Sequence, residues 1–113
     1  MQTIEHKRGT TLSYTAQLSD EDTGAGVDLT GSTVKAELRS RAGLALAATA
    51  VVTVDPDQTT HPGRFTLEVD ATTTEGWTAG DVLLTDVRIV ESGGAVRTTA
   101  TVAISVVERV TAP

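Results

Sequence analysis

Apolar and polar residues alternate along most of this chain, in short runs separated by turn-forming residues. In VDLTGSTVKAELRS, residues 27–40, a DLTG turn leads into such a run. Apolar residues occupy every second position from Val34 to Leu38, and charged residues occupy the positions from Lys35 to Arg39 between them. A period of two is the pattern of a β-strand with one buried face. We therefore interpret this stretch as a strand whose charged side faces solvent.

The same criterion predicts about seven strands, at spacings of roughly 8–12 residues. They cover residues 3–7, 10–18, 32–40, 45–54, 64–70, 82–91 and 95–110. Thr72 and Glu75 have the spacing of a capping box, which predicts one short helical turn near 71–77, closed by Gly76. The predicted fold class is all-β, an immunoglobulin-like β-sandwich of about seven antiparallel strands. We expect a single domain over 1–110 and a C-terminal tail over 111–113.

Composition supports this fold class and narrows the function. The 113 residues include 21 Thr, 14 Val and 3 Ile, and these β-branched residues pack well on a pleated surface. Cys is absent, which rules out disulfides and thiolate metal sites. The net charge is -6 and the basic residues are scattered, so we expect no binding to nucleic acid or to an anionic membrane. No apolar run reaches the ~20 residues of a membrane span, and the N-terminus lacks the apolar region of a secretory signal.

Candidate chemical sites are weak. The acidic loop of residues 19–26 contains three consecutive acids from Asp20 to Asp22, but calcium loops space their ligands at alternate positions, so a solvated loop is favoured. Gly24 and Gly26 precede a strand, whereas a phosphate-binding loop precedes a helix. His6 and His61 form no metal-ligand or triad motif. We therefore predict no enzymatic activity, no cofactor and no small-molecule substrate.

Two features are candidates for protein–protein contact. Asp86 and Arg88 share one face of a strand, which indicates either a surface ion pair or a face toward a partner. The segments 3–7 and 45–54 are candidate sheet edges that could pair with another chain. The candidate interface residues are Ile4, His6, Val52, Val54, Asp86 and Arg88. Trp77 is interpreted either as a core residue, the favoured reading, or as an interface anchor.

The order of the segments resembles a known family. The motifs are RGTTLSYTAQLSD, VDLTGSTVKAELRS, GRFTLEVDATTTEGWTAGD, LLTDVRIVESGGAVRT and VAISVVERVT. This order is similar to that of small immunoglobulin-like virion proteins of tailed bacteriophages and prophages, including the N-terminal domain of phage baseplate upper proteins. The chain departs from that pattern at Leu83 and Leu84, where the family often carries an aromatic residue.

The resemblance implies a non-enzymatic structural component of a tailed-phage virion, in the tail, baseplate, neck or capsid decoration. Its partners would be other virion proteins in a symmetric multi-copy assembly, and its location the virion, after synthesis in the host bacterial cytoplasm. The alternative is a cell-surface or secreted binding and adhesion module with the same fold. The scarcity of aromatic residues argues against a carbohydrate-binding form of that alternative.

Overall fold

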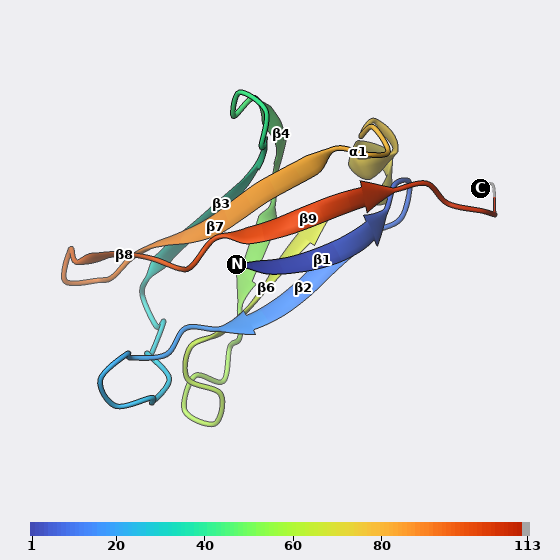
Figure 1. Ribbon diagram of the computed structural model, residues 1–113. Helices are drawn as coiled ribbons and strands as arrows, with labels where there is room; N and C mark the ends of the chain where they lie inside the picture. The colour runs from blue at the N-terminus through green and yellow to red at the C-terminus, as the bar shows by residue number, and fades with distance from the viewer. Residues whose placement is uncertain (112–113) are drawn as a thin grey trace.

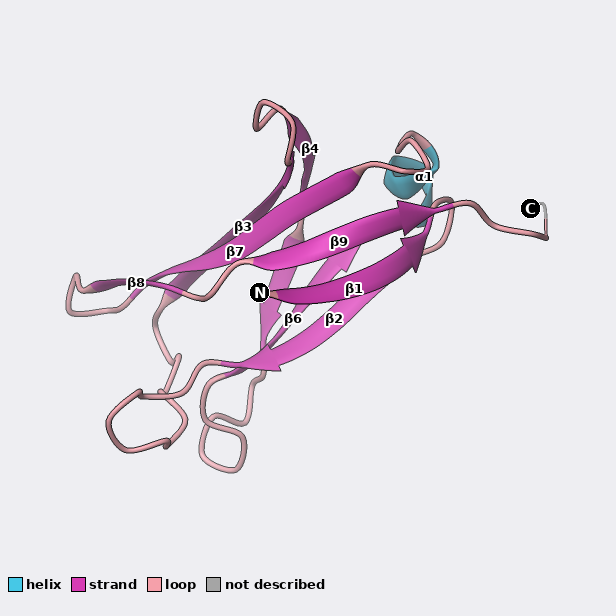
Figure 2. Cartoon of the chain, in the orientation of Figure 1, coloured by secondary structure: helices cyan, strands magenta, loops and turns pink. Residues whose placement is uncertain are grey.

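Two facing β-sheets form the molecule, and the computed structural model describes residues 1–111 (Figures 1 and 2). Sheet A has the strand order β1-β9-β7-β3-β4, with β8 also beside β7, and sheet B has the order β2-β6-β5. The strands are β1 (Gln2–Lys7), β2 (Leu12–Gln17), β3 (Thr33–Ser40), β4 (Leu46–Thr49), β5 (Val51–Val54), β6 (Arg64–Val69), β7 (Val82–Val90), β8 (Val96–Thr98) and β9 (Val102–Val107). The predicted all-β, immunoglobulin-like sandwich is confirmed. Residues 112 and 113 of the predicted tail lie outside the described residues.

The nine strands of the described chain exceed the predicted seven because two predicted strands are each divided. The segment 45–54 changes sheets at Ala50, so that β4 lies at the edge of sheet A and β5 at the edge of sheet B. The segment 95–110 is interrupted at 99–101, where the Thr99 hydroxyl accepts a hydrogen bond from the Val87 amide. In addition, β1 pairs with β9 in parallel, which the antiparallel prediction missed.

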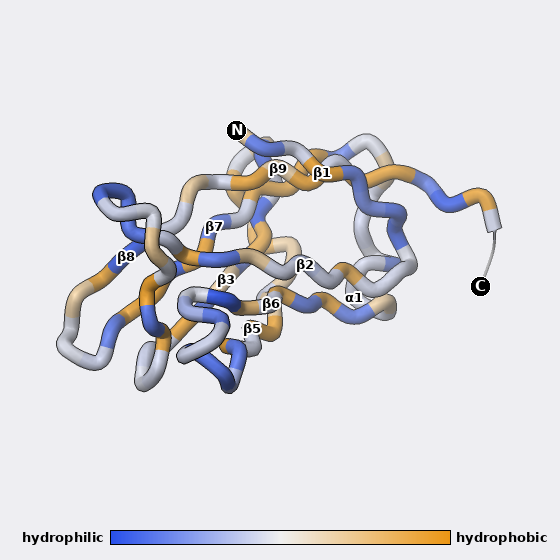
Figure 3. Tube along the Cα trace, turned by 90° about the horizontal axis from the view of Figure 1, so that it is seen from below, coloured by the Kyte–Doolittle hydropathy of each residue, from blue (hydrophilic) through white to orange (hydrophobic). Residues whose placement is uncertain are grey.

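The core lies between the sheets and is built from the inward positions of the alternating strands. Figure 3 shows apolar and polar segments alternating along the trace. Phe65, Ile89 and Val106 are among the most deeply buried side chains. Trp77 is 8% exposed and belongs to the same core cluster, as the favoured interpretation predicted. Leucine, alanine, valine and isoleucine side chains make up the rest of this buried cluster.

A short helix, α1 (Ala71–Glu75), covers one end of the sandwich (Figure 2). The predicted turn is present, but Asp70 caps it by accepting a hydrogen bond from the Thr73 amide, so the predicted capping box of Thr72 and Glu75 is wrong. Glu75 is instead directed toward two arginines. None of the helical structure described here is long and apolar enough to cross a membrane.

Candidate functional site

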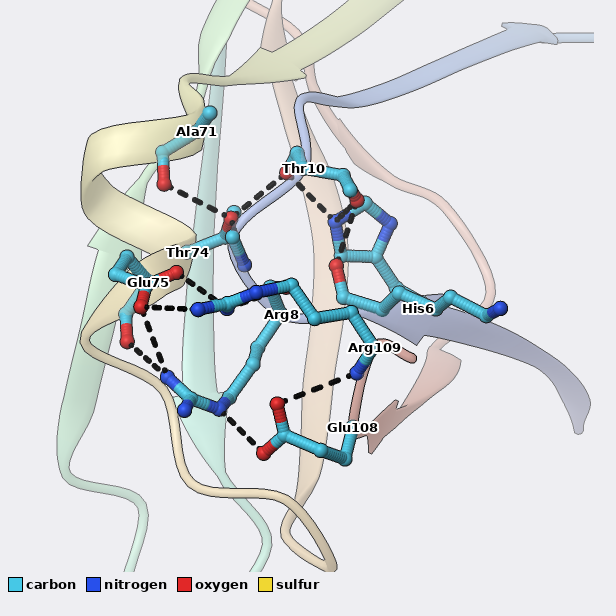
Figure 4. A network of polar contacts seen from close by, with 10 residues as sticks. His6, Arg8, Thr10, Ala71, Thr74, Glu75, Glu108 and Arg109 are labelled. Carbon is cyan, nitrogen blue, oxygen red and sulfur yellow. Dashed lines mark hydrogen bonds and ion pairs between the residues drawn. The ribbon is translucent and has the colours of Figure 1, made fainter. Parts of the chain in front are cut away.

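Two groups of charged residues stand out, and the first surrounds α1 (Figure 4). We call it the polar network: Arg8, Thr10, Thr74, Glu75, Glu108 and Arg109. Arg109 donates to both carboxylate oxygens of Glu75, at 2.6 and 2.9 Å. Arg8 donates to Glu75 at 3.3 Å and to Glu108 at 2.8 Å. The network thereby ties β1, α1 and the end of β9 together.

Thr74 and Gly9 set the geometry of this network. The fully buried Thr74 hydroxyl donates to the Thr10 carbonyl at 2.7 Å and accepts from the Gly9 amide at 3.0 Å. Gly9 has a φ of +80°, and a Cβ atom there would overlap Glu75 and Arg109. The positive φ therefore favours glycine at this position, and a Cβ atom would in addition displace the flexible ends of Glu75 and Arg109.

The ionisation of the polar network follows from its contacts. The hydrogen bond from Arg8 lowers the pKa of Glu108 from its ordinary value, because that bond stabilises the carboxylate. The same contact raises the pKa of Arg8. Every charged member of the network meets a group of opposite sign, so the network is complete within one chain and acts in stability.

The second group lies on the outer face of sheet A and is arranged differently. We call it the striped face: Lys35, Glu37, Arg39, Leu84, Asp86 and Arg88. In the antiparallel pairing of β3 with β7, Glu37 lies opposite Asp86 and Lys35 lies opposite Arg88. Charges of the same sign therefore lie side by side, an arrangement that is unfavourable for directly opposed cross-strand residues.

The charges of the striped face are also largely unpaired. The surface ion pair considered for Asp86 and Arg88 is not formed, and within residues 1–111 neither residue, nor Lys35, makes a salt bridge. Arg39 alone contacts Glu37, at 3.3 Å. All three unpaired side chains, Lys35, Asp86 and Arg88, are exposed. This face can therefore offer both signs of charge to a partner.

A hollow of about 390 Å³ opens onto the striped face, between its charged side chains and Leu44. Leu44 is 57% exposed and has a φ of +58°, which makes it the non-glycine residue of positive φ in the chain's described part. A leucine in this conformation costs about 1–2 kcal/mol. The Arg39 guanidinium holds the turn by donating to the Leu44 carbonyl at 3.0 Å. An apolar side chain is thus held in solvent beside the hollow.

The structure separates the candidate interface residues. Asp86 and Arg88 lie on the striped face, whereas Ile4, Val52 and Val54 are half-buried and pack against the core. Their strands β1 and β5 are sheet edges, so the edge prediction holds for the backbone, while these three side chains face inward.

His6 faces the end of the sandwich near α1. Its Nε2 is 2.9 Å from the Thr10 carbonyl oxygen, and its ring meets Trp77 edge-on at 6.0 Å. The Trp77 Nε1 is buried and lacks a hydrogen-bond partner within the described residues. His6 therefore contributes to packing at this end.

The acidic loop folds on itself. Asp20 accepts hydrogen bonds from the amides of Asp22 and Thr23, at 2.8 and 3.2 Å, as in an Asx-turn. Among residues 1–111, no group of three or more His, Cys, Asp or Glu side chains is placed to hold a metal ion.

The sequence predicted the outward charges of both β3 and β7, but it did not predict that these two strands are neighbours. The alternation identified the outward charges of β3, and the shared face of Asp86 and Arg88 identified those of β7. Their adjacency depends on the pairing of strands about 50 residues apart, for which one sequence holds no direct signal. The polar network was missed, because its members come from three distant segments.

These features define a β-sandwich with one exposed, charge-striped sheet. No family model and no curated protein matches the chain. Among solved structures, the chain is similar to the crystal structure of CopC from Methylosinus trichosporium OB3b, with a TM-score of 0.57. The match covers 98% of this chain and 91% of the CopC chain, at 12% sequence identity. At that identity the likeness shows the fold alone.

This match corrects the phage interpretation. The predicted virion role, the virion location and the associated assignments to tail, baseplate or capsid decoration are wrong, because the structural likeness is to CopC and nothing in the comparisons links the chain to a phage protein. The physical reason is that the motifs behind the prediction are turns and alternations. Such motifs specify a sandwich fold, and one fold serves many functions. The family resemblance itself stays a prediction.

Proposed function

We propose that this protein is a non-enzymatic binding module that recognises another protein surface through the striped face. The observation that carries the proposal is the set of exposed charges, Lys35, Asp86 and Arg88, that lack ion-pair partners within residues 1–111. They border a hollow of about 390 Å³ that also exposes Leu44. Charged groups of both signs around an apolar contact are typical of the rim and centre of protein interfaces.

The sheet edges support this proposal less well than the face. β4 and β5 are four residues long, and short edge strands discourage the addition of another strand. β1 is longer but carries exposed Glu5 and Lys7, which also protect an edge. Recognition by side chains on the face is therefore favoured over strand addition.

The absence of catalysis is part of the same proposal. His6 contacts Thr10 and Trp77 at the α1 end, away from the striped face. Among the described residues, the hollow on this face is lined by Lys, Arg, Asp and Glu side chains and by no histidine, the side chain that most often transfers protons in catalysis. A recognition surface fits these groups better than a reaction centre does.

Quantitative affinity capture from the source cells tests the proposal. The bait is the full chain, either unchanged, or with Asp86→Ala and Arg88→Ala, or with the matched control Arg64→Ala and Glu68→Ala on the outer face of sheet B. Loss of two interface charges is expected to reduce the recovered partner, a second copy of the chain included, at least about tenfold, while the control retains it. Equal recovery with all three baits contradicts the proposal.

A further inference from the structure

The charge stripes have a symmetry that identifies one partner. Ala36 lies opposite Val87 in the pairing of β3 with β7. Counting outward from this pair along each strand, the residues one step away carry opposite charges: Lys35 and Glu37 on β3, and Arg88 and Asp86 on β7. Both strands therefore place a basic residue at one end of the pair and an acidic residue at the other. The two basic residues share one end, and the two acidic residues share the other.

From this pattern we infer that the striped face binds a second copy of this chain through a two-fold axis. The axis passes over the Ala36–Val87 pair. It lies in the plane of the interface and runs perpendicular to the strands. This inference rests on the proposed function. The rotation reverses the strand direction, so it places Asp86 of each copy over Arg88 of the other copy. It likewise places Glu37 of each copy over Lys35 of the other, which makes four intermolecular ion pairs.

The same two-fold rotation also brings apolar side chains of the two copies together. Leu84 and Val90 lie three residues to either side of Val87 on β7, and both are half-buried. The two-fold axis therefore sets Leu84 of each copy over Val90 of the other copy. Two successive pairs of outward residues on β7 therefore meet matching partners across the axis. Asp86 meets a charge of opposite sign, and Leu84 meets another apolar side chain. An isologous interface requires this kind of self-complementarity.

Charge and size are also compatible with pairing of two copies. The chain carries a net charge of -6, yet the striped face holds three basic and two acidic side chains, so the acidic excess lies elsewhere. The nine residues of β7 give a length of ~30 Å, and five strands at ~4.8 Å give a width of ~19 Å. A face of this size is comparable with the lower range of specific interfaces, which predicts a concentration-dependent dimer.

Charge exchange tests the symmetry directly. Sedimentation velocity on the purified 113-residue chain, over a range of concentrations, is expected to show a mass rising from 11.7 kDa toward twice that value. Arg88→Asp alone, or Asp86→Arg alone, places like charges across the axis at two symmetric positions. Each single substitution is expected to weaken dimerisation at least about tenfold. The combined exchange of Asp86→Arg with Arg88→Asp restores the complementarity across the axis, but it also places opposite charges side by side between β3 and β7 of one chain, so it should dimerise at least about threefold more tightly than either single variant.

Two further samples complete the test. An equimolar mixture of the two single variants should form a heterodimer, because one then presents only basic and the other only acidic residues at these β7 positions. Glu68→Arg on sheet B is the matched control and should dimerise like the unchanged chain. Thermal unfolding of every variant shows that it is folded.

The outcomes separate the inference from the proposed function. A folded wild-type protein that stays monomeric, or a combined exchange that does not recover dimerisation, overturns the two-fold pairing. If the wild type is monomeric while capture from cells still depends on Asp86 and Arg88, the pairing is wrong and the face binds a different protein. If the protein dimerises and no substitution on the face affects dimerisation, the two-fold pairing is overturned. If capture from cells is then also unaffected by these substitutions, the face assignment is contradicted as well.

Discussion

The polar network and the striped face contain the same kinds of charged side chain, but they arrange these charges in opposite ways. In the network, the Glu75 carboxylate lies between Arg8 and Arg109, and each charge meets its opposite within one chain. On the face, Glu37 lies opposite Asp86, and the neighbouring basic residues are likewise grouped by sign. The first arrangement is complete and the second leaves charges available.

This difference teaches how to separate structural from functional charges in a protein without a catalytic motif. The polar network contains four charged residues and the striped face contains five, so counting charged residues would not distinguish the two regions. What distinguishes them is whether each charge is satisfied inside the chain. A satisfied cluster indicates a role in stability, and an unsatisfied, ordered pattern indicates recognition.

The largest expected effect comes from breaking the network through its backbone. Gly9→Ala places a methyl group against Glu75 and Arg109 at a φ of +80°. We expect a loss of about 2–3 kcal/mol, from about 1–2 kcal/mol of backbone strain together with weakened charged hydrogen bonds. The melting temperature should fall by about 10 °C. Differential scanning calorimetry provides the measurement.

Gly43→Ala is the matched control for this prediction. Gly43 has a φ of +88°, but open space surrounds the position of its absent Cβ. It should therefore show the strain alone, about 1–2 kcal/mol. Equal losses for the two variants would mean that the network contributes nothing beyond the backbone.

A smaller effect is expected from neutralising one acid in each region. Glu75→Gln keeps the shape but removes the charge that two arginines share, so it should cost about 1 kcal/mol. Asp86→Asn removes a charge that has no ion-pair partner within residues 1–111, so its effect should stay within about 0.5 kcal/mol. Urea unfolding at concentrations where the chain is monomeric measures both. An equal loss of unfolding free energy for the two variants would mean that the charges of the network are no better satisfied than those of the face.

The smallest effect concerns pH. Since Arg8 lowers the pKa of Glu108, the folded state binds a proton there less readily than the unfolded state does. The resulting stabilisation is present above the ordinary carboxyl pKa, about 4.3, and is lost as the pH falls through the lower folded value. Glu108→Gln should therefore flatten the acid limb of the stability curve and leave its slope near neutral pH unchanged. Melting temperatures measured from pH 2 to 7 test this, and an unaltered acid limb would contradict it.

Local pattern was sufficient for the fold class and for most strands. The alternation around Phe65 and Leu67 gave β6 directly, because one face of that strand is buried and the other exposed. The divided strands could not be predicted in the same way. Ala50 continues the alternation of its neighbours, and only tertiary pairing makes the chain change sheets there. Thr99 similarly looks like a strand residue until its hydroxyl bonds to Val87.

The candidate site shows the same limit at longer range. Asp86 and Arg88 were identified from their spacing, which indicated either a surface ion pair or a face toward a partner, and the structure has no such ion pair. Whether two residues on one strand attract each other depends on what faces them, and here Lys35 and Glu37 come from a strand far away in the sequence. Function read from the order of motifs failed for a related reason, because that order encodes the sandwich rather than its partners.

The parallel pairing of β1 with β9 has a mechanical consequence. The two strands run in the same direction along six residue pairs, so the start of β1 and the end of β9 lie at opposite ends of the ladder that they form (Figure 1). A pulling force applied through those ends would act along the strands and load the whole ladder at once, instead of opening it one bond at a time. The salt bridge between Arg8 and Glu108 lies at the end of this ladder and would carry part of the same load. A pull on both ends of the described chain would thus be resisted by all the hydrogen bonds between β1 and β9 together, because the force would load them in shear.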